Sequence, residues 1–439
     1  MSLPPGPSAP AALQTLAWVR KPIALLEDSR RRFGHRFTLR FVGGRSYVLF
    51  SRPADVKTLF QLPVESFVSA NLAMKPFLGE ESLFTLEGER HRRHRRLIGP
   101  PLRGERLHVY ARLIDEIVAE EMTRWPLHQP FPIIVRMRDI TLRLIFRAVF
   151  GVREPATQAR LAELIKALTE GPTAMLAFLP LFRRDLGAWS PWGRFQRLRQ
   201  ELVATLTEEV RAARRDPAGR EDILARLVVE GQAEGDPLGD TEIVDELVTL
   251  LAAGHETSTA ALAWAFQWIL GDAATERAIV DEVRGASAGG LDHAALERMP
   301  GLEAAVLETL RMMPIVPIVP RLLVRPVVID DLELPAGTYA TACAYLTQHD
   351  PEVHADPETF RRDRFLGKRS SPFELYPFGG GHRHCIGGAL ALYETRAIVA
   401  AVLRRARLRR PDPRPQAFGR QGITVTPREG TPVIVEERL

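Results

Sequence analysis

The residue best suited to chemistry in this sequence is Cys385, within the segment PFGGGHRHCIGGALALYETR. The glycines at 379–381 permit close approach of the backbone to a flat ligand. An apolar helix is expected over residues 386–404. Its N-terminus, together with Arg383 and the flanking histidines, favours a thiolate at Cys385. A thiolate in this setting can ligate haem iron. The alternatives are an inert buried cysteine and a nucleophilic cysteine beside a histidine.

The spacing around Cys385 favours the haem-ligand interpretation over these two alternatives. Phe378, Gly381, Arg383, Cys385 and Gly387 match each fixed position of Phe-x-x-Gly-x-Arg-x-Cys-x-Gly. This is the haem-binding signature of cytochromes P-450, and the chain resembles that family. The resemblance implies a haem-thiolate monooxygenase with haem b (iron protoporphyrin IX). Cys385 is then the metal ligand, with Phe378, Arg383 and Gly387 among the cofactor-binding residues. The implied fold is mainly α with a minor β region and a long central helix over the haem.

An acid and an arginine three residues apart, Glu308 and Arg311, lie in the apolar segment LEAAVLETLRMMP. An exposed pair of this kind contributes roughly 0.2–0.5 kcal/mol. The apolar neighbours predict burial instead, and a buried pair needs further hydrogen bonds to offset its desolvation. The family supplies a third partner from the loop before the cysteine, and Arg364 matches it. Arg362 stands where the family usually has proline. The implied triad has a structural role, holding the loop that presents Cys385.

The longest apolar region, residues 243–270, contains the segment LLAAGHETSTAAL. Its internal charges are costly in a bilayer, so a helix buried in the protein core is expected. By themselves, its small and hydroxyl residues fit a packing notch or a bend. The family resemblance identifies Ala253, Gly254, Glu256, Thr257 and Ser258 as an oxygen-activation motif. The implied catalytic residues are Thr257, which delivers protons to bound dioxygen, and Glu256, which relays them from solvent near neutral pH.

The segment GERHRRHRRLIGPPL is unusually basic. Its side chains could form a solvated helix face or an arginine-rich nucleic-acid patch. The family pattern instead places His91 and Arg95, four residues apart, on the haem propionates, and Arg321 matches a further propionate position. The remaining arginines are expected to face solvent, where they would steer an acidic redox protein; they are Arg90, Arg92, Arg93 and Arg96.

Apolar residues dominate the segments that line the family's substrate pocket. Each one singly is more often ordinary core. Together they predict an apolar substrate, which a fatty acid, terpenoid, steroid or polyketide would fit. The expected pocket residues are Phe84, Phe178, Leu250, Ala253, Gly254, Val316, Ile318, Val319 and Ile423.

The chain of 439 residues is 45% hydrophobic and carries a net charge of +5. Its two cysteines exclude a disulfide framework and fit the reducing cytoplasm. The N-terminus lacks the features of a signal peptide or membrane anchor. One domain over residues 1–439 is expected, with a proline-rich lead-in at 1–12. A hairpin is predicted over 37–50, helices over 102–313, strands near 322–329 and 339–345, and a strand pair from GITVTP and TPVIVEE in the tail.

The resemblance is closest to soluble bacterial members, and a role in secondary metabolism is expected. The implied electron donor is a ferredoxin or flavodoxin with its reductase, and the implied co-substrate is O₂. A monomer without nucleic-acid partner or membrane anchor is expected. Two alternatives stay open: a haem-thiolate peroxygenase or isomerase that uses peroxide, and a non-enzymatic haem or nucleic-acid binding protein. The intact Glu256–Thr257 pair argues against the first.

Overall fold

The computed structural model describes the chain except residues 1–2, 71–73, 153, 170–182, 184–186, 188–189, 217–219, 221, 234 and 422–423. The chain divides into two compact units. Unit 1 comprises Met1–Ala70, Leu107–Arg138 and Thr257–Leu439, and unit 2 comprises Asn71–Arg106 and Asp139–Glu256. The predicted character, mainly α with a minor β region, is confirmed.

The described residues of unit 2 form helices joined by loops, with no strand among them. Its longest complete helix, α10, begins at Pro191, where proline is tolerated because the first helical N–H needs no partner. The Ser190 side chain caps this helix by accepting from the Gly193 N–H at 3.0 Å. The helices that lie within unit 2 are α4 (Lys75–Leu78), α5 (Gly88–Ile98), η3 (Pro100–Leu102), η5 (Ile145–Val149), α8 (Pro155–Thr169), α10 (Pro191–Arg215) and α11 (Ile223–Ala233).

Three further helices cross from one unit's residue range to the other's: η4 (Gly104–Leu107), α7 (Ile133–Leu144) and α12 (Asp240–Ile269). The predicted helix over residues 243–270 is thus confirmed as α12. Among the described residues, no helix is both long and apolar enough to span a bilayer.

Unit 1 holds a five-stranded sheet in the order β1-β2-β8-β5-β3. Strands β1 (Arg36–Phe41) and β2 (Arg45–Phe50) form the predicted hairpin. Gly43 and Gly44 turn it with φ of +97° and +74°, as a two-glycine turn between twisted strands requires. The other strands are β3 (Phe67–Ser69), β5 (Val319–Leu323) and β8 (Tyr339–Ala342), and β6 (Val327–Ile329) pairs with β7 (Leu332–Leu334) as a separate ribbon.

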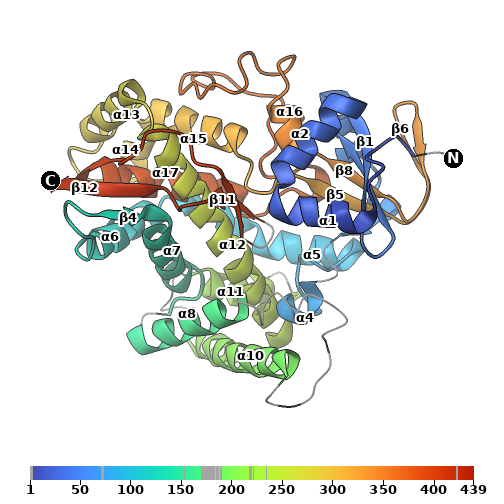
Figure 1. Cartoon of the computed structure of the whole chain (residues 1–439). Coiled ribbons are helices and arrows are strands. Elements are labelled where there is room, and N and C mark those ends of the chain that lie inside the picture. The colour runs from blue at the N-terminus through green and yellow to red at the C-terminus, as the bar shows by residue number, and fades with distance from the viewer. Residues whose placement is uncertain are drawn as a thin grey trace. The chain divides into compact units, whose positions relative to one another are not determined.

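In unit 1, α17 (Gly388–Leu403) packs against α6 (Tyr110–Met122), α13 (Ala273–Ala286) and α15 (Pro300–Met312) (Figure 1). Every residue of α17 from Tyr393 to Leu403 is buried, and this stretch includes the polar residues Glu394, Thr395 and Arg396. The other helices of unit 1 are α1 (Ala11–Arg20), α2 (Pro22–Phe33), α3 (Pro53–Phe60), η1 (Val64–Ser66), α14 (His293–Glu297), α16 (Ala344–Gln348) and η8 (Gly381–Arg383).

The predicted pairing of the two tail strands is wrong. Strand β11 (Thr424–Pro427) pairs with β10 (Phe418–Gln421), whereas β12 (Pro432–Arg438) pairs with β4 (Pro130–Pro132) and β9 (Ala406–Arg409). Between β11 and β12 the chain turns through Gly430 and Thr431, both at positive φ. The Thr431 hydroxyl donates to the Ala263 carbonyl at 2.9 Å. This buried contact directs β12 to a different sheet, and local pattern alone did not predict it.

Candidate active site

Cys385 lies in a tight loop between η8 and α17, three residues before the first residue of α17. Its backbone N–H donates to the Phe378 carbonyl at 3.0 Å, and the His384 N–H donates to the Gly381 carbonyl at 3.0 Å. These bonds close the loop on itself, while the Cys385 residue is exposed. The loop therefore presents a thiol outward at the start of a buried helix.

The glycines of this loop are required by its contact with α3. A Cβ on Gly380 would lie 2.1 Å from Phe60 Cδ2, and one on Gly381 would lie 2.3 Å from the Phe60 carbonyl oxygen. Gly381 also has a φ of +66°, which side chains disfavour. A Cβ on Gly387, in contrast, would meet nothing within 4 Å. An exposed cysteine on a loop whose Gly380 and Gly381 leave no room for side chains fits a flat group whose metal takes one sulfur ligand.

Arg321 on β5 lies against the cysteine loop. Its Nη2 donates to the Gly380 carbonyl at 3.0 Å, and its guanidinium carbon lies 5.1 Å from the centre of the Phe67 ring. Arg383 is half-buried in η8. Both cations thus belong to the unit that carries Cys385, where they could hold the carboxylates of a cofactor.

His91 and Arg95 lie one turn apart on α5, in unit 2. His91 is buried and Arg95 is half-buried. Three of the neighbouring arginines, Arg90, Arg92 and Arg96, are exposed as expected. The expectation is wrong for Arg93, whose side chain is 22% exposed. Asp236 and Glu242 hold it at 2.8 Å and 2.7 Å, so it is an internal ion-pair partner of α12.

Glu308, Arg311 and Arg364 meet in a buried cluster. Arg311 donates to Glu308 from Nε at 2.8 Å and from Nη2 at 3.0 Å, and Arg364 Nε donates to both carboxylate oxygens at 3.0 Å and 3.1 Å. The remaining Arg311 donor reaches the Gln348 carbonyl at 2.8 Å. The two remaining terminal nitrogens of Arg364 donate to loop carbonyls of Ala355, Asp356 and Thr359. These extra bonds are what a buried ion pair needs.

Glu256 and Thr257 are consecutive on α12, and both are half-buried. The preceding residue, His255, is buried and its Nδ1 lies 3.1 Å from the Thr141 hydroxyl. Sequence reasoning gave His255 no role beyond its charge. Its position directly before the acid–alcohol pair was the available signal.

Ser258 is buried on the same helix and donates to Glu394 of α17. Sequence reasoning missed Glu394, although it is the only acid in the mostly apolar run GALALYETRAIVAAVL, which was a visible signal. Burial raises the pKa of Glu394 to about 7. This contact links the helix that carries Thr257 to the helix that follows Cys385.

Replacing Glu394 by glutamine is expected to change how stability depends on pH. The folded protein favours the protonated carboxyl, whereas the unfolded chain releases its proton near the ordinary pKa of 4.5. The stability of the unaltered protein should therefore fall, relative to Glu394→Gln, as pH rises from about 4.5 to about 7. The full difference is about 3 kcal/mol. Urea midpoints of both proteins across this range measure it, and parallel pH profiles would contradict it.

The expected pocket residues are divided between the two units. Phe84 precedes α5, and Leu250, Ala253 and Gly254 lie on α12, all in unit 2. Val316, Ile318 and Val319 follow α15 in unit 1. All seven are half-buried, which distinguishes them from the fully buried core. Phe178 and Ile423 lie outside the described residues.

Comparison with known proteins gives consistent matches over the whole chain. The family model for cytochrome P-450 matches residues 4–433. A Mycobacterium tuberculosis protein named as cytochrome P-450 135B1 is 35% identical over 93% of this chain and 86% of its own length. Another from the same organism, named as cytochrome P-450 138, is 32% identical over 99% of this chain and 97% of its own.

Solved structures give the same result for the fold. The retinoic acid-bound cyanobacterial CYP120A1 superposes with a TM-score of 0.83 at 24% identity, covering 100% of both chains. CYP175A1 from Thermus thermophilus superposes with a TM-score of 0.73 at 26% identity, covering 97% of this chain and 98% of its own.

Proposed function

Because this chain belongs to the cytochrome P-450 family, we propose that it hydroxylates or epoxidises an apolar small molecule, using electrons from a separate redox protein. The chain is a haem-thiolate monooxygenase and its prosthetic group is haem b. One catalytic domain spanning both units is part of the proposal, since the family match runs through both. The observation that carries it is the outward thiol of Cys385 on its closed glycine loop.

The proposed cofactor contacts are those that the family resemblance assigns to this sequence. Cys385 is the proposed iron ligand, with Phe378 and Gly387 beside it in the signature. Arg321 and Arg383 are proposed to bind the propionates from unit 1, and His91 and Arg95 from unit 2. When bound, haem supplies the activation of O₂ for insertion of one oxygen atom, which is chemistry that side chains do not provide.

Glu256 and Thr257 are proposed to move protons. The Thr257 hydroxyl holds a proton at the reaction centre, and the Glu256 carboxyl collects the next from solvent. Their adjacent places on α12 and their partial exposure support a relay that solvent can reach. The buried Glu308–Arg311–Arg364 cluster is proposed to act only on structure, by fixing the chain before the cysteine loop.

Replacing Thr257 by alanine is expected to preserve haem binding and to waste electrons as hydrogen peroxide. Removing one proton donor should lower product formation roughly 100-fold, while electron consumption continues. Peroxide and product are measured together against electrons supplied. Thr257→Ser keeps the hydroxyl and should remain largely coupled. If Thr257→Ala formed as much product per electron consumed as the unaltered protein, the proposed relay would be contradicted.

The substrate is proposed to be a fatty acid, terpenoid, steroid or polyketide. The half-buried apolar positions of both units support this class, since they offer apolar surface with few charges. The retinoic acid in the cyanobacterial structure belongs to that protein, and at 24% identity the likeness shows the fold alone. A spectral-shift screen of the haem-loaded protein with apolar ligands of these classes tests the proposal. The absence of any shift would contradict it.

The electron donor is proposed to be an acidic ferredoxin or flavodoxin with its reductase, in the cytoplasm. Arg90, Arg92 and Arg96 are exposed on one helix and pair with partly exposed acids, Glu81, Glu89 and Asp236. Their exposed guanidinium groups support an acidic partner, which could compete for these pairs. The matching test compares turnover with a redox partner against turnover with peroxide alone. Faster turnover with peroxide would favour a peroxygenase.

A further inference from the structure

Three polar side chains of α12 hold the segment of residues 79–86 that precedes α5. Asp245 accepts from the Glu81 N–H at 3.0 Å, and Glu246 accepts from the Leu83 N–H at 2.8 Å. Between them, the Thr249 hydroxyl donates to the Ser82 hydroxyl at 2.7 Å. Three consecutive residues of the segment are thus bonded to one helix. We call Asp245, Glu246 and Thr249 the latch.

The segment is shaped around the latch at Gly79. A Cβ there would lie 2.0 Å from the Asp245 carboxylate, and its φ of +101° disfavours any side chain. Arg199 of α10 bonds Asp245 at 3.3 Å and also donates to the Phe77 carbonyl at 2.9 Å. Asp245 therefore contacts both the segment and a second helix.

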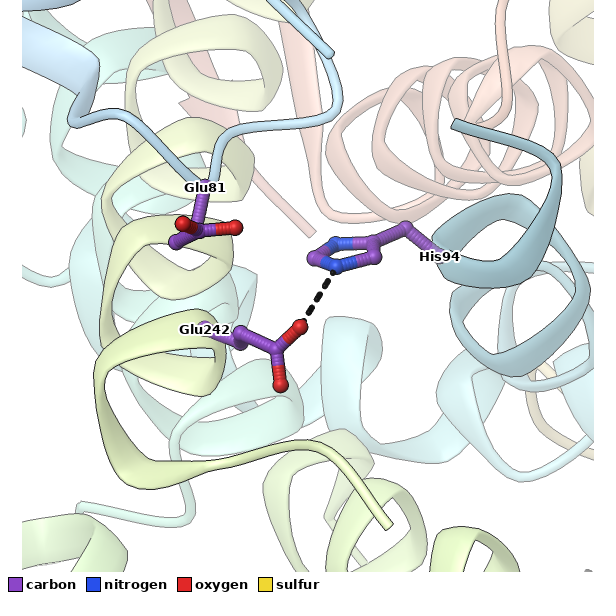
Figure 2. Close-up of side chains that lie close together, drawn as sticks. All are labelled: Glu81, His94 and Glu242. Atoms are coloured by element: carbon purple, nitrogen blue, oxygen red, sulfur yellow. Dashed lines mark hydrogen bonds and ion pairs between the residues drawn. The ribbon is translucent and has the colours of Figure 1, made fainter. Parts of the chain in front are cut away.

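Glu246 has an additional partner on α5. The same oxygen that accepts from Leu83 lies 2.7 Å from Nδ1 of His94, whose side chain is fully buried. Nε2 of His94 faces Glu242 at 3.2 Å (Figure 2). Burial raises the pKa of Glu246 to about 7, so this acid is held where its charge is costly. Its bonds to Leu83 and His94 give a reason for that placement.

The neighbouring Glu81, His94 and Glu242 could also be viewed as metal ligands, since one ligand atom of each lies within 4.8 Å of the others (Figure 2). Both acids already have arginine partners, because Arg90 forms an ion pair with Glu81 and Arg93 forms one with Glu242 at 2.7 Å. The arrangement is therefore better explained as an ion-pair network than as a cation site.

We propose that Glu246 is a positioning residue for substrate selection, because it fixes the backbone at Leu83 and so sets the place of the adjacent Phe84 in the pocket wall. The inference rests on the proposed function, in which Phe84 lines the pocket. A buried N–H that loses its acceptor is unfavourable, and a short loop can relieve that cost by moving. Asp245 holds Glu81, and Thr249 holds Ser82, whose hydroxyl oxygen also accepts from the Phe84 N–H at 3.2 Å.

The test compares two ligands on the haem-loaded protein. Phenylimidazole binds the iron and extends toward the pocket wall, whereas imidazole binds the iron without that extension. Glu246→Leu should weaken phenylimidazole binding about tenfold, with imidazole binding and the thiolate signature of the reduced carbon monoxide complex unchanged. Glu246→Gln keeps an oxygen acceptor and should restore most of the affinity. Glu242 contacts His94 and Arg93 and accepts no hydrogen bond from the described backbone of the segment, so Glu242→Gln should bind both ligands normally.

Equal weakening of both ligands, or no change in either, would overturn the positioning role. If Glu246→Leu yields no haem-loaded protein, the same two ligands are measured on Thr249→Val instead. It removes the Ser82 bond with little change of shape, and about threefold weaker phenylimidazole binding with normal imidazole binding is expected. Failure of the unaltered protein to bind either ligand would instead count against the proposed function.

Discussion

Cys385→Ala is expected to abolish monooxygenase turnover and the thiolate absorption signature of the reduced carbon monoxide complex. The loop should survive the change, because the bond from residue 385 to the Phe378 carbonyl comes from the backbone, which alanine retains. The glycine contacts with Phe60 are also untouched. The loss would therefore report on the sulfur and not on misfolding. The reduced carbon monoxide difference spectrum measures it directly.

The second cysteine supplies the matched control. Cys343 is fully buried, and burial raises the pKa of its thiol to about 12, so it stays neutral. Cys343→Ala should keep both the signature and turnover. An intact signature in Cys385→Ala, or its loss in Cys343→Ala, would refute the assignment of the iron ligand.

Glu308→Ala is expected to cost about 3–5 kcal/mol of folding stability, because it leaves two buried guanidinium groups without their carboxylate. Glu308 and Arg311 have no side-chain exposure, and Arg364 has 9%. The Arg361 N–H, at 2.9 Å from Glu308, would lose its acceptor as well. Urea midpoints and the fraction of protein that retains haem measure the effect.

An exposed pair with the same spacing gives the comparison. Glu208 and Arg211 lie on α10 with side chains 65% and 56% exposed, at 2.6 Å. Glu208→Ala should change stability by less than about 1 kcal/mol, since solvent screens such pairs. Similar losses for Glu208→Ala and Glu308→Ala would contradict the role assigned to burial.

Features carried by local spacing could be predicted from the sequence. The cysteine loop, the Glu308–Arg311 pair, the hairpin at β1 and β2, and the long helix α12 each depend on residues within one segment. Arg364 lies 56 residues along the chain from Glu308, and only the resemblance to a family predicted that the two would pair. The solvent-facing expectation for Arg93 failed because its partners, Asp236 and Glu242, lie about 150 residues along the chain.

What could not be predicted depends on contacts between distant segments. The role of Glu394 depends on its contact with Ser258 on another helix, and the role of Glu246 depends on its contacts with Leu83 and His94. The tail strands have suitable composition for pairing with each other, but the buried Thr431 bond to Ala263 separates them. Periodicity shows which face of a helix or strand is apolar. It does not show which polar side chain on a remote element will hydrogen-bond to that helix or strand.

The close fit of Gly380 and Gly381 against Phe60 limits how this scaffold can be altered. A methyl group at either position would collide with α3, so the sulfur-bearing loop and the end of that helix must change together or not at all. Mutational libraries aimed at new oxidation products should therefore leave this trio fixed. Diversity is better introduced at the half-buried apolar positions that are proposed to line the pocket.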